Sequence, residues 1–242
     1  MDETIKVTGL SKSYAGNKVI SNIELSIGTG QVLGLLGANG AGKTTTIECI
    51  LGTRKADAGS VSILGLDPRK ERKQLFEQVG VQFQEASYSD KIKVWELCEE
   101  TACLYRKAAN YEELLRQFGL WEKRGAFVYE LSGGQKQRLF IVLALLPDPK
   151  VVFLDELTTG LDTKARRGVW KSLDALKQKG LTIFLSSHFM DEVEVLCDTI
   201  TILKDGNFIF KGTVQEAIHQ SPYDNLEEAY LWFTGEEETD DE

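Results

Sequence analysis

Gly37-Ala38-Asn39-Gly40-Ala41-Gly42-Lys43-Thr44 is a complete phosphate-binding loop. The apolar run at residues 31–36 precedes it and predicts a buried strand, and residues 44–51 can begin a helix directly after it. Glycines in such a loop let the backbone bend until successive N–H groups face phosphate oxygens, and the N-terminus of the helix adds partial positive charge. The strand, loop and helix together predict that the chain binds a nucleoside triphosphate.

Side chains of the loop complete the predicted phosphate site. Lys43 can reach the β- and γ-phosphates, and the Thr44 hydroxyl can bind Mg²⁺. The residues of this stretch that we expect to contact ATP are Gly37, Ala38, Asn39, Gly40, Ala41, Gly42, Lys43, Thr44 and Thr45.

A second motif, Val151-Val152-Phe153-Leu154-Asp155-Glu156, supplies two carboxylates. Its continuous apolar run predicts a strand that is buried on both faces and ends near Asp155. Open α/β sheets bind their ligands at the carboxyl ends of the strands, so we expect Asp155 to hold Mg²⁺ opposite Thr44. Glu156 follows at once and can activate the attacking water as a general base.

Composition limits the kinds of protein that the chain can be. It has 242 residues, of which 42% are hydrophobic, which suffices for one large domain with its own core. The formal net charge of −9 argues against nucleic acid as a partner. The 4 cysteines form no CxxC pair and there are 2 histidines, so reduced thiols are expected rather than a disulfide or metal framework.

The spacing of apolar residues predicts the order of the elements. In the N-terminal half we expect strands at residues 4–8, 19–27, 60–64 and 79–83 and helices at residues 94–107, 111–118 and 135–146. In the C-terminal half we expect strands at residues 151–154 and 181–185, helices at residues 164–179 and 191–197, and a terminal hairpin of residues 199–203 and 208–211. The expected class is α/β, with a parallel core and a helical insert at about residues 85–131. An acidic tail follows at residues 236–242.

Further motifs make the chain resemble an ATP-binding cassette (ABC) ATPase, the motor subunit of an ABC transporter. Leu131-Ser132-Gly133-Gly134-Gln135 matches the family signature, and Gln84 matches the glutamine of its Q-loop. Gly160-Leu161-Asp162 resembles the D-loop, His188 the switch histidine, and Tyr14 the aromatic residue that stacks on adenine. The resemblance implies one ABC ATPase domain at residues 1–235, in which an N-terminal antiparallel β-subdomain and the inserted α-helical subdomain flank a P-loop NTPase core.

The same resemblance implies how the motifs cooperate. Two cassettes would pack head to tail, with ATP between the phosphate loop of one and the signature of the other. The signature residues Ser132, Gly133, Gly134 and Gln135 would then act on the partner's ATP, and their small size would allow the backbone to approach closely. The implied catalytic residues are Glu156, His188 and Gln84, the implied D-loop residue is Asp162, and the implied Mg²⁺ ligands are Thr44, Gln84 and Asp155.

One position departs from the common family pattern. Most members have proline after the catalytic glutamate, whereas this chain has Leu157. The variant resembles exporter ATPases associated with drug, antibiotic or lipid efflux, and His188-Phe189-Met190-Asp191-Glu192 points the same way. Leucine permits the turn without fixing φ, so we expect catalysis to be retained.

The resemblance implies a peripheral subunit on the inner face of the cell membrane that pairs with separate transmembrane subunits. No apolar run is long enough to span a bilayer, and residues 1–4 do not resemble a signal peptide, which predicts a cytoplasmic location. A groove in the helical insert, with apolar contacts from Tyr88, Ile92, Val94 and Trp95, would receive the transmembrane partner, although at least half of these residues are expected to pack the insert core. The cassettes could form a homodimer or a heterodimer.

Two other functions compete with this interpretation. A soluble ABC ATPase acting on ribosomes or DNA is one alternative, but such proteins usually carry two cassettes or a long coiled-coil insertion, which this chain lacks. A GTPase is the other, but no Asn-Lys-x-Asp motif is present to read guanine. The transported molecule and the direction of transport do not follow from these residues.

Overall fold

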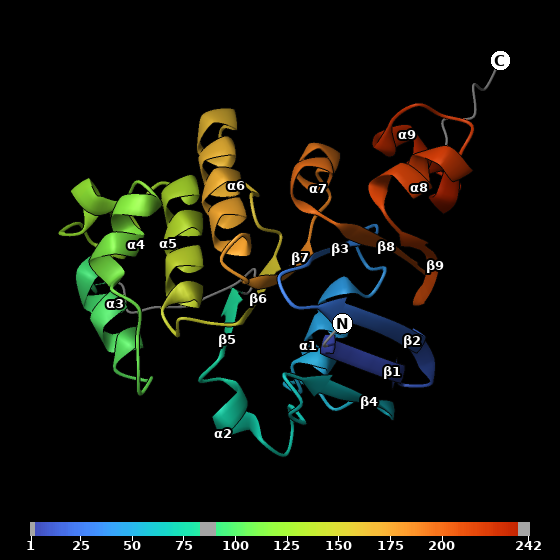
Figure 1. The fold of residues 1–242 in the computed structure, drawn as a ribbon, viewed down its shortest axis with the longest axis horizontal. Coiled ribbons are helices and arrows are strands. Elements are labelled where there is room, and N and C mark those ends of the chain that lie inside the picture. The colour runs from blue at the N-terminus through green and yellow to red at the C-terminus, as the bar shows by residue number, and fades with distance from the viewer. Residues whose placement is uncertain (1–2, 83–90, 237–242) are drawn as a thin grey trace.

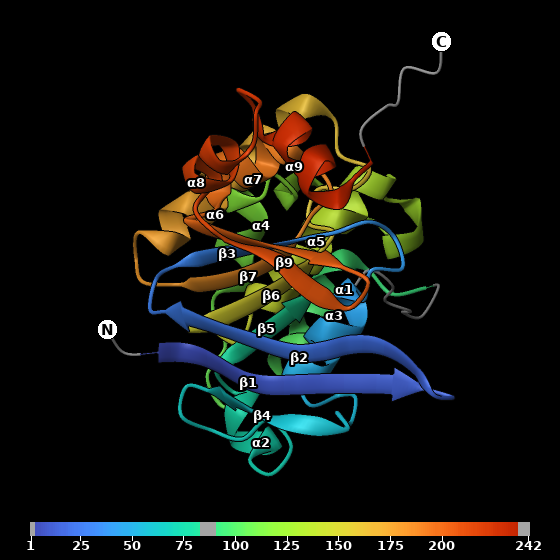
Figure 2. The same cartoon turned by 90° about the vertical axis from the view of Figure 1, so that its right-hand side faces the viewer.

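Two sheets organise the computed structural model, which describes residues 3–82 and 91–236. The smaller sheet is antiparallel, has the order β2-β1-β4, and consists of β1 (Glu3–Tyr14), β2 (Asn17–Gly28) and β4 (Ala58–Ile63). It lies along one side of the larger sheet, with the long β1 and β2 strands crossing the molecule (Figure 2).

The larger sheet has the order β5-β6-β7-β3-β8-β9. It contains β3 (Val32–Leu36), β5 (Val79–Gln82), β6 (Val151–Asp155), β7 (Thr182–Ser186), β8 (Thr199–Lys204) and β9 (Asn207–Gly212). All its neighbouring strands are parallel except β9, which forms an antiparallel hairpin with β8. Every residue of β3, β6 and β7 is buried, as expected for parallel strands covered on both faces.

The helices divide between two ends of the larger sheet (Figure 1). At one end lie α3 (Val94–Ala102), α4 (Tyr111–Gln117), α5 (Gly133–Leu145) and α6 (Thr163–Lys177), with short 3₁₀ turns at Trp121–Lys123 and Val128–Glu130. At the other end lie α8 (Val214–Gln220) and α9 (Leu226–Thr234), and α7 (Met190–Leu196) stands between the two groups. The remaining helices are α1 (Lys43–Ile50) and α2 (Arg72–Leu75).

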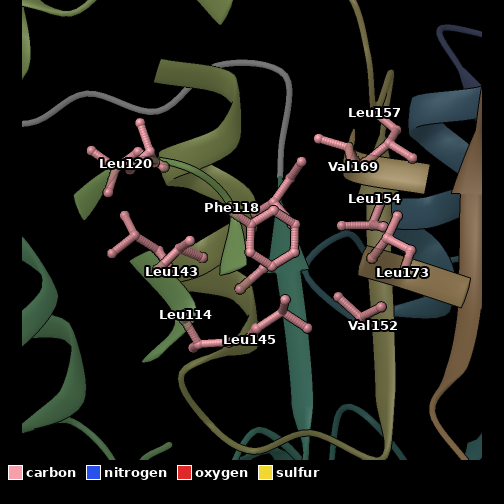
Figure 3. Packing of buried hydrophobic residues seen from close by; sticks show 14 of the residues in the cluster. Leu114, Phe118, Leu120, Leu143, Leu145, Val152, Leu154, Leu157, Val169 and Leu173 are labelled. Carbon is pink, nitrogen blue, oxygen red and sulfur yellow. The ribbon is translucent and has the colours of Figure 1, made fainter. Parts of the chain in front are cut away.

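One apolar cluster joins the helical segment to the larger sheet. Phe118 at the end of α4 packs among leucines of α5 and faces side chains of β6 and α6 (Figure 3). Leu154 and Leu173, which belong to β6 and α6, are fully buried in the same cluster. Burial of each such side chain contributes roughly 1.5–3 kcal/mol, so the helical segment is anchored on the strand that ends at Asp155.

The structure confirms the α/β class, the parallel core and the β8–β9 hairpin, and it corrects three other expectations. The hairpin is not terminal, because α8 and α9 follow it. Helix α3 ends at Ala102 instead of residue 107, and Leu104 beyond its end is 74% exposed, so the apolar face does not continue. Helices α2, α8 and α9 were not predicted, although Thr213 with Glu216 forms a capping box at the start of α8.

No helix of residues 3–82 and 91–236 combines the length and the apolar character needed to cross a bilayer.

Candidate active site

The phosphate-binding loop connects β3 to α1. Gly42 caps α1 with φ of 107°, a conformation that glycine adopts without strain. A Cβ atom at Gly42 would lie 2.8 Å from the Val19 carbonyl oxygen, so the close approach of β2 also excludes a side chain. The position therefore demands glycine for both conformation and space.

Lys43 is 7% exposed and its ammonium group stays within the loop. Its Nζ donates to the Gly37 carbonyl at 2.7 Å and to the Ala38 carbonyl at 3.2 Å. Burial lowers the pKa of Lys43, while the carboxylates of Glu156 and Asp155 oppose that effect. A partly desolvated cation of this kind gains strongly from an anionic ligand.

Asp155 stands at the carboxyl end of β6 and is 3% exposed. Thr44 Oγ1 donates to Asp155 Oδ2 at 3.5 Å, and Ser186 Oγ donates to Asp155 Oδ1 in a short hydrogen bond. The hydroxyl and carboxylate oxygens that the sequence assigned to Mg²⁺ thus face each other. Oxygen donors of this type fit a Mg²⁺ ion, which is usually bound through one or two carboxylates together with water and phosphate oxygens.

Glu156 has φ of 53°, the left-handed region that residues other than glycine rarely adopt. Two hydrogen bonds hold the turn that it begins: Gln137 Nε2 donates to the carbonyl oxygens of Glu156 at 3.0 Å and of Leu157 at 2.9 Å. A third comes from Ser186, whose Oγ accepts from the Glu156 N–H at 3.0 Å. These contacts fix the main chain of Glu156, a residue that lines the pocket.

A pocket of about 620 Å³ collects the loop, Glu156 and His188. His188 follows β7, is exposed, and lies with its ring centroid 4.2 Å from that of Phe189. The pocket is thus built at the carboxyl ends of β3, β6 and β7, where α/β sheets bind their ligands. Its lining residues are Val19, Gly37, Ala38, Asn39, Gly40, Gly42, Lys43, Thr44, Thr45, Glu156, Ser187, His188, Met190, Tyr230 and Glu236.

Several functional neighbours were missed by the sequence analysis. Gln137 and Ser186 bind the main chain and carboxylate of the Asp155-Glu156 pair, and the pocket is also lined by Tyr230 in the middle of α9 and by Glu236 just after that helix. Only Gln137 had a sequence signal, since it lies two residues after the signature on the same helix. The others are brought in by tertiary packing.

Tyr14 lies outside the residues that line the pocket. Its side chain is 37% exposed at the end of β1, with Lys12 Nζ 5.3 Å and Arg54 Cζ 5.5 Å from the ring centroid. The ring therefore has two cations close to it and remains open to solvent. Gln84 and Tyr88 lie outside the described residues.

The signature residues do not line the pocket of their own chain. Ser132 is exposed and caps α5, where its Oγ accepts from the Gln135 N–H at 3.3 Å and its N–H donates to Gln135 Oε1 at 3.0 Å. A Cβ atom on Gly134 would lie 3.0 Å from Leu161 Cδ2, so a glycine allows α5 to approach the turn after β6 closely. Asp162 ends that turn and caps α6, with Oδ1 accepting from the Ala165 N–H at 2.8 Å.

Two residues of the predicted groove are buried, as was expected for at least half of the four. Ile92 is 8% exposed and Val94 is fully buried, and both pack in the core of the helical segment. Trp95 remains partly exposed and borders a cavity of about 410 Å³ together with Tyr111 and Trp121.

Comparison with known proteins identifies relatives that are ABC transporter proteins or ATP-binding proteins. The sequence pattern of the ABC transporter family matches residues 20–159. The Nod factor export ATP-binding protein I of Rhizobium etli is 35% identical over 225 residues, which are 89% of this chain and 70% of that protein. The daunorubicin resistance ATP-binding protein DrrA3 of Streptomyces coeruleorubidus is 32% identical, and the match covers 93% of this chain and 73% of that protein. ABC transporter A family member 9 of Dictyostelium discoideum is 35% identical, but the chain spans only 26% of its length.

Solved structures agree with the fold. The ATP binding subunit of an ABC transporter superposes with a TM-score of 0.87 at 29% identity, covering 96% of this chain and 99% of the other. The cbiO1 protein of Clostridium perfringens, described as part of the ABC transporter complex cbiONQ, superposes with a TM-score of 0.78 at 28% identity, covering 91% and 92%.

Proposed function

The chain belongs to the ABC transporter family of ATP-binding domains, and we propose that it is the ATP-hydrolysing motor subunit of an exporter with separate transmembrane subunits. The family assignment makes it an ATPase of the kind coupled to transport. The observation that carries the proposal is the pocket in which Lys43, Thr44, Glu156 and His188 meet at the carboxyl ends of parallel strands.

The exporter assignment draws on two further observations. Leu157 replaces the common proline and is fully buried beside the signature helix, where Gln137 binds its carbonyl. Two relatives of similar sequence are named for Nod factor export and for daunorubicin resistance. We take the direction of transport from these names and not from the pocket, because an ATPase of this kind acts on nucleotide alone.

In this proposal ATP lies along the loop at residues 37–45, with its phosphates on the backbone N–H groups and on Lys43. Tyr14 stacks on the adenine. Thr44 and Asp155, together with Gln84, hold Mg²⁺, which when bound neutralises charge on the β- and γ-phosphates. The hydrogen bond of 3.5 Å between Thr44 and Asp155 supports a shared site for the ion.

Glu156 then acts as the general base toward the attacking water. Its rigid main chain, held by Gln137 and Ser186, supports such a role because a base must keep a fixed direction toward its proton. His188 stands on the neighbouring strand end and contacts the γ-phosphate.

We propose that the signature completes the site of a second cassette. Ser132 and Gly133 are exposed at the N-terminus of α5 and are absent from the pocket of their own chain, which supports a role toward another chain. The partial positive charge of the helix N-terminus favours a phosphate there. Two cassettes, identical or different, would thus enclose two ATP molecules.

The proposed transmembrane subunits dock at the helical segment, and they hold the chain at the inner face of the membrane. Trp95 with Tyr111 and Trp121 offers an aromatic surface on the helical segment, and aromatic residues are the side chains most enriched at such anchor positions.

Co-purification tests the proposed function. The chain should co-purify with a transmembrane protein encoded beside it, and ATP hydrolysis of the complex should respond to reconstitution in lipid vesicles. Trp95→Arg should weaken the association by about 30-fold, the loss of one aromatic anchor, whereas Trp232→Arg on the exposed side of α9 should not. Co-sedimentation with ribosomes in place of membranes would instead contradict the proposal.

A further inference from the structure

Glu192 is a carboxyl group with no solvent exposure that the reaction described above does not use. It lies on α7, four residues after His188. Trp170 of α6, itself 8% exposed, donates from Nε1 to Glu192 Oε1 at 3.1 Å. Ser187 and Thr158, each 1% exposed, lie near the same carboxyl on the segments after β7 and β6 and lower its pKa, whereas Glu192 Oε2 and Thr158 Oγ1 have no hydrogen-bond partner among the described residues. A buried carboxyl with one donor and one unpaired oxygen is costly, so its retention calls for an explanation.

A second side chain of α6 holds the same segment. Arg166 lies one helical turn before Trp170, on the same face. Its Nη1 donates to both carboxylate oxygens of Asp191, at 3.2 and 3.0 Å, and its Cζ lies 4.4 Å from the centroid of the Phe189 ring. Arg166 and Trp170 of α6 therefore both contact residues 189–192, which directly follow His188.

The two segments that meet at Glu192 each carry a residue of the proposed reaction. Ser187 is bonded to His188, and Thr158 lies two residues after Glu156. Ser187 Oγ also accepts from the Phe189 N–H at 3.0 Å, which fixes the backbone on both sides of His188. A single carboxyl near both segments and hydrogen-bonded to α6 can therefore set the separation between His188 and Glu156.

We propose that Glu192 is a positioning residue that holds the His188 segment at a fixed place relative to Glu156. The inference rests on the proposed function, since it takes His188 and Glu156 as the residues that act on ATP. Trp170 and Arg166 support Glu192 from α6, the helix that Asp162 caps, so the switch histidine and the D-loop turn are predicted to move as one unit.

Turnover measurements test the proposal in two backgrounds. Glu192→Gln removes one acceptor oxygen and should lower kcat roughly tenfold with KM for ATP changed less than about twofold, because the loss affects alignment and not binding. Glu194→Gln, on the exposed side of the same helix, should match the parent. In a His188→Ala background Glu192→Gln should cause no further loss, since two residues that act through one contact are not additive.

The outcomes separate this inference from the proposed function. A tenfold loss from Glu192→Gln in both backgrounds would overturn the positioning role alone, as would parental turnover of Glu192→Gln when His188→Ala is impaired. Parental turnover of His188→Ala would remove the role of His188 itself and this inference with it. If Glu192→Gln does not fold, Trp170→Phe keeps an aromatic side chain but removes the N–H donor with part of the indole, and it should lower kcat about threefold in the parent and not in His188→Ala.

The pH dependence of unfolding gives a separate check on the buried carboxyl. Burial raises the pKa of Glu192 above its ordinary 4.5, and Ser187, Thr158, Trp170 and Arg166 oppose the rise; Cys197 and Asp191 are the other titratable groups nearby. Because the folded pKa is the higher one, the stability that this group contributes is complete below about 4.5 and is lost as pH rises through the folded pKa.

Glu192→Gln cannot titrate, so its Tm relative to the parent should rise with pH above 4.5. The expected gain is about 3–5 °C for each unit by which the pKa is raised, measured by thermal unfolding between pH 4.5 and 8. Glu194→Gln should show no such trend. A constant difference between Glu192→Gln and the parent would show that the carboxyl is not held in the buried site described here.

Discussion

Glu156→Gln should lower ATP hydrolysis by at least about 10²-fold while ATP binding is retained. Glutamine has the same shape but cannot take a proton from water. The substitution should also leave the fold intact, because Gln137 and Ser186 hold residue 156 through its main chain and not through its carboxylate. Steady-state turnover and calorimetric titration with ATP measure the two quantities separately.

A matched control and an opposite outcome complete this test. Glu194→Gln makes the same chemical change on the exposed side of α7 and should keep parental turnover. With hydrolysis blocked, Glu156→Gln should also accumulate an ATP-bound dimer that gel filtration resolves. Near-parental turnover of Glu156→Gln would show that another group activates the water and that the assignment of the base is wrong.

The fold was predictable where a local pattern decides it. The strands β3 and β6 are apolar runs that end in a glycine-rich and an acidic motif, and β7 has an apolar centre before Ser187 and His188. Such strands have few other places to lie than the centre of a parallel sheet. The end of α3 was not predictable in this way. Residues 103–107 keep helix-forming side chains, and only the solvent position of Leu104 shows that the apolar face has ended.

The first residues of the site were predictable because their spacing is fixed by backbone geometry. Lys43 and Thr44 must follow the loop glycines, and Asp155 must end the strand. The order of residues along the sequence is therefore enough to identify these three site residues. Glu192 shows the opposite case. It stands beside Asp191 in the sequence, yet one carboxyl is exposed and paired with Arg166 while the other is buried on Trp170. Only the packing of α6 against α7 distinguishes them.

Ile92 and Val94 belong to the half of the four predicted groove residues that was expected to pack the core. From the sequence alone, an apolar side chain in a helical segment fits a docking groove and a buried core equally well. Whether it is buried depends on which face of its helix packs against α4 and α5. Here both residues contribute to the core that surrounds Phe118, and Trp95 alone among the described three reaches the surface.

Lys43→Ala should lower ATP affinity by at least about 10²-fold, because the substitution removes a buried cation whose hydrogen bonds to phosphate are charge-assisted. The chain should still fold, since Lys43 bonds only to loop carbonyls and α1 keeps its Gly42 cap. Ser132→Arg should leave ATP affinity unchanged, because Ser132 lies outside the pocket of its own chain, but it should block the proposed dimer.

Mixing the two variants tests whether one ATP is shared between chains. A heterodimer of Lys43→Ala with Ser132→Arg has one site with both substitutions and one site with neither. The unsubstituted site combines the phosphate loop of the Ser132→Arg chain with the signature of the Lys43→Ala chain. With Glu156→Gln present in both chains, the mixture should form ATP-dependent dimers in light scattering, and neither variant alone should do so. If Ser132→Arg by itself dimerises with ATP as readily as the parent, the signature does not bind the partner's nucleotide. The exposed Ser132 at the start of α5 would then need another role, and the motor would have to work without composite sites.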